Sequence, residues 1–151
     1  MPSRTALPTA QATSPAALGG ELRVALTRIS RRLRSQRGAT DLSDGQFGVL
    51  TVLHKHGEMS PGALAEHERT RPPSMTRTVS TLAELGLVEK AEHATDRRQV
   101  VVRLTHAGAR EVRETRRRQD AWLTQQLSDL TPDEREILAR ATELLIRIAA
   151  R

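Results

Sequence analysis

Residues 68–90 read ERTRPPSMTRTVSTLAELGLVEK, and this stretch decides the fold. Pro72-Pro73 marks a break in the chain, and Ser74 can cap the helix that follows it. Gly86 is a candidate for the residue that ends this helix. Between these signals, three apolar residues recur at helical spacing and predict one buried stripe on a helix of about three turns: Met75, Val79 and Leu82.

A shorter helix is predicted just before this stretch. Ser60-Pro61 is a start signal with proline at the first helical position, and Ala63, Leu64 and His67 continue it for two turns. Two short helices joined by about four residues are typical of a helix-turn-helix. After Gly86 the apolar period changes to two, so LVEKAEH and QVVVRL are predicted strands joined by a turn at HATDRR. A hairpin in this place predicts a wing.

Four further helices complete a predicted fold that is mainly α with a small β-hairpin wing. Ser43-Asp44-Gly45-Gln46 and Thr131-Pro132-Asp133-Glu134 are capping boxes, and Thr105 can cap the helix after the hairpin. Residues 1–17 are rich in Pro, Ser, Thr and Ala and are interpreted as a flexible tail. The expected helices cover residues 18–38, 43–57, 106–127 and 131 onward, with a glycine ending each of the first two.

The first and last helices carry more apolar surface than a small winged lobe can cover. Such a surface usually marks an interface between molecules. Residues 41–105 are therefore predicted to form the winged helix-turn-helix lobe, and residues 18–40 and 106–151 a helical dimerisation region. Its expected contacts are Leu22, Leu26, Ile29, Leu33, Trp122, Leu144, Leu145 and Ile148.

Composition narrows the class of function. Lys plus Arg is 24 against 18 Asp plus Glu, a net charge of +6 that favours a polyanionic partner. The chain has no cysteine, which excludes disulfides and thiol redox sensing. It has neither a long apolar span nor a signal peptide, so we expect a cytoplasmic protein with no membrane partner. With no phosphate-binding loop, nucleophile elbow or metal-ligand spacing, we expect neither an enzyme nor a cofactor or metal.

The helix over residues 74–82 presents small polar side chains around one arginine. A helix that enters the major groove needs short side chains, and it needs a fork such as Arg77 to read guanine O6 and N7. A solvated face would look the same on an isolated helix, but the neighbouring helix and hairpin favour DNA contact. The predicted DNA contacts of the helix-turn-helix are Ser60, Pro73, Ser74, Thr76, Arg77, Thr78 and Thr81, and Ser80 also points outward.

The turn of the hairpin adds three charged residues, Asp96-Arg97-Arg98. A narrow minor groove has an enhanced negative potential that attracts arginine, so Arg97 and Arg98 are predicted DNA contacts. Asp96 is predicted to hold an arginine in place through a bidentate pair. The alternative is a charged tip that keeps a sheet edge soluble.

Two runs of arginine have a simpler interpretation. Those of the long helix could bind phosphate or an anionic ligand. Glu111, Glu114 and Asp120 lie three or four residues from them, so a solvated face with helical ion pairs is favoured. The same holds for the arginines near the end of the first helix. The two runs are Arg110, Arg113, Arg116, Arg117 and Arg118, and Arg28, Arg31, Arg32 and Arg34.

Together, PPSMTRTVSTLAELGLVEK at 72–90 and DRRQVVVRLTHAG at 96–108 resemble the MarR family of winged helix-turn-helix regulators. The resemblance runs from about residue 20 to the end of the chain. It implies a homodimer on a pseudo-palindromic operator in double-stranded DNA, usually repressing nearby genes and in some cases released by a small effector. The family's Asp-x-Arg and Leu-Thr-x-x-Gly positions are filled by Asp96, Arg98, Leu104, Thr105 and Gly108.

The resemblance also implies roles for single residues. Arg98 would be the wing arginine that enters the minor groove, with Asp96 as its supporting carboxylate. Ser74, Arg77 and Thr78 would lie on the groove-facing side of the recognition helix. Without cysteine the chain cannot be a thiol-based peroxide sensor, and without tyrosine a pocket for flat phenolic ligands would lack stacking partners. Either the effector is aliphatic or small and anionic, or there is no effector.

Two other functions stay open at this stage: a winged-helix protein-interaction module and a non-specific architectural DNA-binding protein. Serine and threonine around Arg77 argue against the first, because the cores of protein interfaces are enriched in aromatic residues and depleted in serine.

Overall fold

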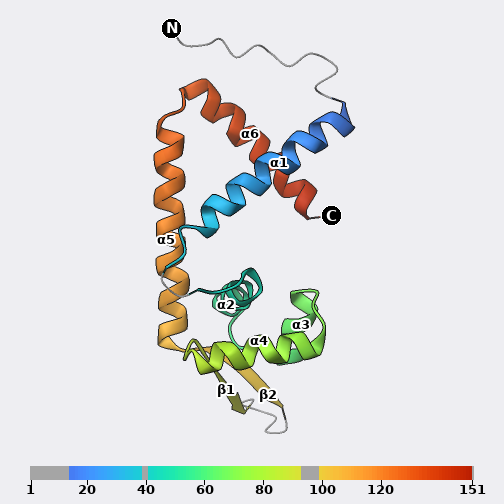
Figure 1. The fold of residues 1–151 in the computed structure, drawn as a ribbon, viewed down its shortest axis with the longest axis vertical. Coiled ribbons are helices and arrows are strands. Elements are labelled where there is room, and N and C mark those ends of the chain that lie inside the picture. The colour runs from blue at the N-terminus through green and yellow to red at the C-terminus, as the bar shows by residue number, and fades with distance from the viewer. Residues whose placement is uncertain (1–13, 39–40, 93–98, 151) are drawn as a thin grey trace. The chain divides into compact units, whose positions relative to one another are not determined.

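The computed structural model describes residues 14–38, 41–92 and 99–150 (Figure 1). These ranges contain six helices and one antiparallel hairpin, which confirms the predicted mainly α, winged helix-turn-helix fold. Residues 1–36 and 37–151 are separate compact units, so α1 is described by itself. The elements are α1 (Pro15–Arg34), α2 (Asp44–His56), α3 (Pro61–His67), α4 (Pro72–Glu84), β1 (Val88–Glu92), β2 (Val100–Leu104), α5 (His106–Ser128) and α6 (Pro132–Ala149).

Local sequence starts most of these helices with a side-chain cap. A Ser or Thr hydroxyl oxygen accepts a hydrogen bond from a backbone N–H of the first turn, which would otherwise lack a partner. Both predicted capping boxes form, since Gln46 and Glu134 each accept from the backbone N–H of their cap residue, at 2.8 and 2.9 Å. The capping residues are Ser14 for α1, Ser43 for α2, Ser60 for α3, Thr105 for α5 and Thr131 for α6.

The predicted cap of α4 is wrong. This helix begins at Pro72, and its N-cap is Arg71, whose side chain makes no capping hydrogen bond. A residue before proline is driven to extended backbone, and Arg71 has φ −75° and ψ 140°, so the helix starts at the first proline. Ser74 therefore lies inside the first turn rather than ahead of it.

Both predicted ends of the first helix also shift. Ser14 caps α1 and Pro15 takes the first helical position, so residues 15–17 belong to the helix and not to a tail. At the other end α1 stops at Arg34, before Gly38. A Cβ at Gly38 would lie 2.8 Å from Nη2 of Arg118, the far end of a flexible side chain that can move aside, so glycine is not required there by packing.

One apolar core joins α2, α3, α4, the hairpin and the first part of α5 (Figure 1). Met75, Val79 and Leu82 of α4 are buried, as predicted from their spacing. They pack in the same cluster as side chains of the other elements that are fully excluded from solvent: Leu50 of α2, Leu64 of α3, Val102 of β2 and Val112 of α5. The polar face of α4 is thereby fixed on the outside of the lobe.

The hairpin pairs β1 with β2 from Val88 opposite Leu104 to Glu92 opposite Val100. Met59, between α2 and α3, forms a bridge to Val102 through backbone hydrogen bonds of 3.1 and 2.8 Å. This bridge ties the wing to the segment that precedes α3.

A tight junction links the end of α4, the start of the wing and the start of α5. Gly86 ends α4 with φ +71°, as predicted, and its carbonyl accepts a 2.6 Å hydrogen bond from the Thr105 hydroxyl. The same hydroxyl oxygen accepts from the N–H of Gly108 at 3.1 Å. Gly108 is packed so closely that a Cβ there would lie 2.0 Å from the carbonyl oxygen of Leu87. The wing therefore starts from a fixed position relative to α4.

Candidate nucleic-acid interface

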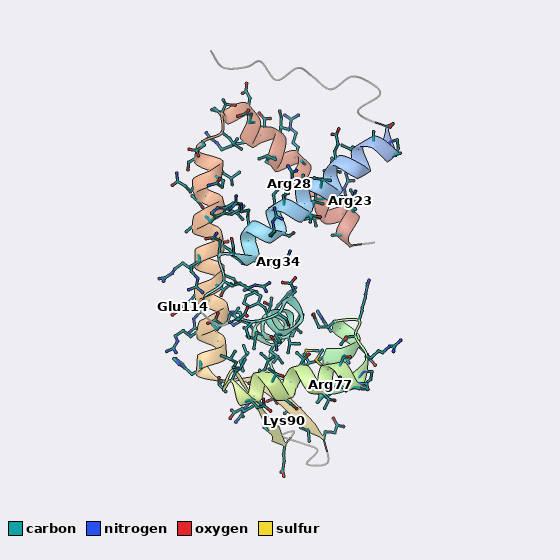
Figure 2. All side chains as sticks on the ribbon, in the orientation of Figure 1. Arg23, Arg28, Arg34, Arg77, Lys90 and Glu114 are labelled. Carbon is teal, nitrogen blue, oxygen red and sulfur yellow. The ribbon has the colours of Figure 1, made fainter. Side chains whose placement is uncertain are left out.

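The exposed face of α4 carries the residues predicted to meet DNA. Because Met75, Val79 and Leu82 point into the core, the opposite side of the helix faces solvent. Figure 2 shows Arg77 on this helix. Pro73, Ser74, Thr76 and Arg77 are exposed, whereas Thr78, Ser80 and Thr81 are half-buried.

Hydrogen bonds within α4 limit what its threonines can offer a base. The Thr76 hydroxyl donates to the carbonyl of Pro72 at 3.0 Å, and the Thr81 hydroxyl donates to the carbonyl of Arg77 at 3.1 Å. Both hydroxyl hydrogens are therefore used, which leaves lone pairs that can accept from base amino groups and methyl groups that can contact thymine. On this face the strong hydrogen-bond donor is Arg77.

Arg77 is well placed to act as that donor. Its guanidinium is exposed and has no carboxylate partner among the residues that the structure describes. The planar guanidinium offers parallel N–H groups that match guanine O6 and N7. A free fork on a helix held firmly by its other face is the chemistry that reading one guanine requires.

Ser60 lies at the start of α3, where its hydroxyl oxygen accepts from the N–H of Ala63 at 3.2 Å. As a cap it fixes the first turn of the helix, and the hydroxyl hydrogen remains available to donate. Ser60 is half-buried.

Sequence reasoning did not single out two arginines in the turn between α3 and α4. Arg69 and Arg71 are both exposed, and Arg69 has φ +50°. The turn is held by backbone hydrogen bonds from Arg69 to Glu66 and from Thr70 to Ala65, of 3.1 and 2.9 Å. No glycine or asparagine marks this left-handed position, so the sequence carried no signal for it.

The three predicted wing-tip residues, Asp96, Arg97 and Arg98, lie outside the described residues. The stem that carries them is described, and Arg103 of β2 there pairs with Glu89 of β1 at 2.7 Å. Lys90 of β1 is exposed (Figure 2).

The net charge of +6 is not concentrated in the winged lobe that is predicted to bind DNA. Residues 41–105 contain eight basic and nine acidic side chains, so the winged lobe is close to neutral. Residues 1–40 contain seven basic side chains and one acidic one and account for the excess. Attraction of DNA to the lobe must therefore depend on where individual cations are placed.

The two terminal helices expose the apolar stripes predicted for dimerisation. Neither α1 nor α6 has a buried residue, although both are amphipathic. Leu22, Leu33 and Leu145 are half-buried, and so is Trp122 on α5. The more exposed members are Leu26 at 44%, Ile29 at 46%, Leu144 at 51% and Ile148 at 63%.

Other side chains with possible chemistry show simpler contacts. On α5, Arg118 lies 3.9 Å from the Glu114 carboxylate, one of the predicted helical pairs. The rings of His56 and His67 contact each other in a tilted arrangement, with 5.4 Å between their centroids. In the described ranges no three His, Asp or Glu side chains are arranged to hold a metal ion, and no helix is long and apolar enough to cross a membrane.

Comparison with known proteins agrees with this geometry. The model of the MarR family matches residues 42–100, which span the lobe from the start of α2 to the start of β2. The chain is 42% identical over 135 residues to the HTH-type transcriptional regulators Mb0904 of Mycobacterium bovis and MT0903.1 of Mycobacterium tuberculosis. Each alignment covers 89% of this chain and 94% of the relative. The chain belongs to the MarR family.

Solved structures have the same fold. A putative transcriptional regulator from Pseudomonas aeruginosa superposes with a TM-score of 0.80 at 30% identity, covering 92% of this chain and 99% of that one. A MarR family protein from Bacillus stearothermophilus has the same fold, with a TM-score of 0.78 at 21% identity, covering 90% and 95%. This MarR-family chain is therefore a helix-turn-helix transcriptional regulator.

Proposed function

We propose that this MarR-family chain is a homodimeric repressor that binds a two-fold symmetric operator through α4 and the wing. The observation that carries the proposal is the outer face of α4. There Arg77 is an exposed donor fork among small hydroxyl side chains, on a helix whose other face is fixed in the core. Such a face fits the major groove, where Arg reads guanine.

The dimer follows from the terminal helices. Regulators of this family bind DNA as dimers, and the exposed stripes of α1 and α6 here are the apolar surfaces that a second copy would cover. In the dimer, two copies of α4 would enter successive major grooves about 34–36 Å apart. The wings would reach the flanking minor grooves, with Arg97 and Arg98 at their tips.

Repression would come from occupancy of the operator near a promoter. A small ligand would relieve it by binding more tightly to a spacing of the two lobes that does not suit the operator. The nearly neutral charge of residues 41–105 argues against a non-specific architectural role, because non-specific binding rests almost entirely on neutralised phosphates.

Selection of bound duplexes from a random DNA library, with purified full-length protein, tests this function. We expect enrichment of one sequence with two-fold symmetry and half-sites about 10 base pairs apart. A reporter with the selected site beside its promoter should then be repressed. Enrichment of no sequence despite binding would indicate an architectural protein, and no binding even at low salt would indicate a protein-interaction module.

A further inference from the structure

The turn between α3 and α4 places arginine at two positions where the backbone favours other residues. Arg69 has φ +50°, in the left-handed region that favours glycine and, after it, asparagine. Arg71 is the N-cap of α4, a position that favours Ser, Thr, Asp or Asn. Its side chain makes no capping hydrogen bond, whereas the other five helices described each have a Ser or Thr cap.

Nothing within the described protein uses either charge. Both side chains are exposed, and within the described ranges neither makes an ion pair or a side-chain hydrogen bond. The neighbouring carboxylate of Glu68 lies instead 3.5 Å from Nδ1 of His67. Arginine at these two positions therefore leaves a left-handed turn residue and an uncapped helix, and no contact within the described protein compensates for them.

Charge in the rest of the lobe makes this placement significant. The lobe is nearly neutral, so any binding of phosphate depends on a few unpaired cations. Arg103 is neutralised by Glu89 at 2.7 Å, while Arg69, Arg71 and Arg77 fall within nine residues and lack carboxylate partners in the described structure. Arg69 and Arg71 lie directly before the first turn of α4, the helix that carries Arg77.

We propose that Arg69 and Arg71 bind DNA phosphates at the edge of the major groove that α4 enters. The proposal rests on the function proposed above and adds two contacts that position the protein without reading sequence. Because phosphate contacts are independent of base identity, their loss should weaken binding to all duplexes by the same factor.

The substitutions Arg69→Asn and Arg71→Ser separate this role from a structural one. Asparagine tolerates the left-handed region, and serine supplies the missing cap, so the melting temperature of each variant should stay unchanged or rise. DNA binding should change in the opposite direction. For each variant we expect the slope of log K against log salt to fall by about one per lobe, hence about two per dimer.

Arg113→Gln on α5 is the matched control, because it removes one charge from an exposed arginine that also lacks a described partner. It should leave the slope within about half a unit of the wild type. Two results would overturn the proposal: unchanged affinity and slope in Arg69→Asn and Arg71→Ser, or an equal loss in Arg113→Gln. If the wild type selects one operator and both turn variants bind it as the wild type does, only the proposed phosphate contacts of Arg69 and Arg71 are refuted. If the wild type binds no duplex, the proposed function is refuted as well.

Discussion

At the scale of single residues, Arg77 is the charged, forked donor on a face whose other polar groups are hydroxyls. The hydroxyls of Thr76 and Thr81 donate to their own helix, so they cannot donate to a guanine. Discrimination at one base pair of each half-site should therefore rest on one side chain. Replacing Arg77 should therefore change base specificity at that one position.

Arg77→Ala should cost about 1–3 kcal/mol of binding free energy per contact and relax specificity at one position of each half-site. Arg77→Lys should relax specificity in the same way while it keeps the salt slope, because lysine retains the charge but loses the fork. Competition between operator variants with each base at each position measures both effects. An equal loss on all sequences would mean that Arg77 binds phosphate instead.

At Gly108 the structure predicts a large effect of substitution on stability. A Cβ at this position would lie 2.0 Å from the Leu87 carbonyl oxygen, and a backbone atom cannot move aside easily. Gly108→Ala should lower the free energy of unfolding by about 3 kcal/mol, as in an overpacked core. Gly45→Ala is the control, because no atom lies within 4 Å of its Cβ and alanine favours the helix. Chemical denaturation measures the free energy of unfolding of both variants. Equal values for Gly108→Ala and Gly45→Ala would contradict the close packing at Gly108.

Residue-scale prediction from sequence succeeded where a residue acts through its local neighbours. The stripe of Met75, Val79 and Leu82 follows from helical spacing alone, and its burial is confirmed. Ser74 was the wrong cap because two successive prolines moved the helix start upstream. The left-handed Arg69 could not be predicted, since the turn geometry and not its side chain determines that conformation.

At the scale of elements, helix caps formed by residues of the same turn were predictable from the sequence. Capping residues act within one turn, so both capping boxes and the Thr105 cap are confirmed. The end of α1 was misplaced, since the helix stops at Arg34 and not at Gly38. Beyond it, Arg37 is held by groups outside the helix, with its guanidinium 2.9 Å from Asp44 and 4.7 Å above the Phe47 ring.

The wing is the element whose tip stays a prediction. Its stem is fixed at the Thr105–Gly108 junction and by the Met59 bridge. Arg98→Ala should weaken binding to operator and random duplex alike and lower the salt slope by about one per lobe. The same titration on Arg103→Ala is the control, because Arg103 is already paired with Glu89. An unchanged slope in Arg98→Ala would refute the minor-groove role.

At the scale of the whole molecule, α6 offers a matched test of the dimer. Ile146 and Ile148 are equally exposed, at 63%, but they lie on different faces of the helix. Ile148 continues the stripe of Leu144 and Leu145, whereas Ile146 lies about 160° around the helix from Leu144 and Ile148 and about 100° from Leu145. Ile148→Glu should shift the protein to monomers at micromolar concentration and abolish operator binding, and Ile146→Glu should not. Analytical ultracentrifugation measures the oligomeric state of the two variants, and identical sedimentation would contradict an interface through Ile148.

The net charge of the whole molecule does not show where along the chain the excess positive charge lies. The excess of +6 matches the balance of residues 1–40, while the lobe proposed to bind DNA is nearly neutral. Sequence-specific binding should therefore exceed non-specific binding by a wide margin at moderate salt, because the lobe gains little from general attraction.

A salt titration of the full-length protein against duplex DNA tests the central claim most directly. It would compare the segment upstream of the protein's own gene, or the operator obtained by selection, with a random duplex of equal length. We expect tight binding of one dimer to the operator, a steep dependence on salt, and binding to random DNA that is weaker by at least about a thousandfold. Equal affinity for both duplexes at every salt concentration would contradict it.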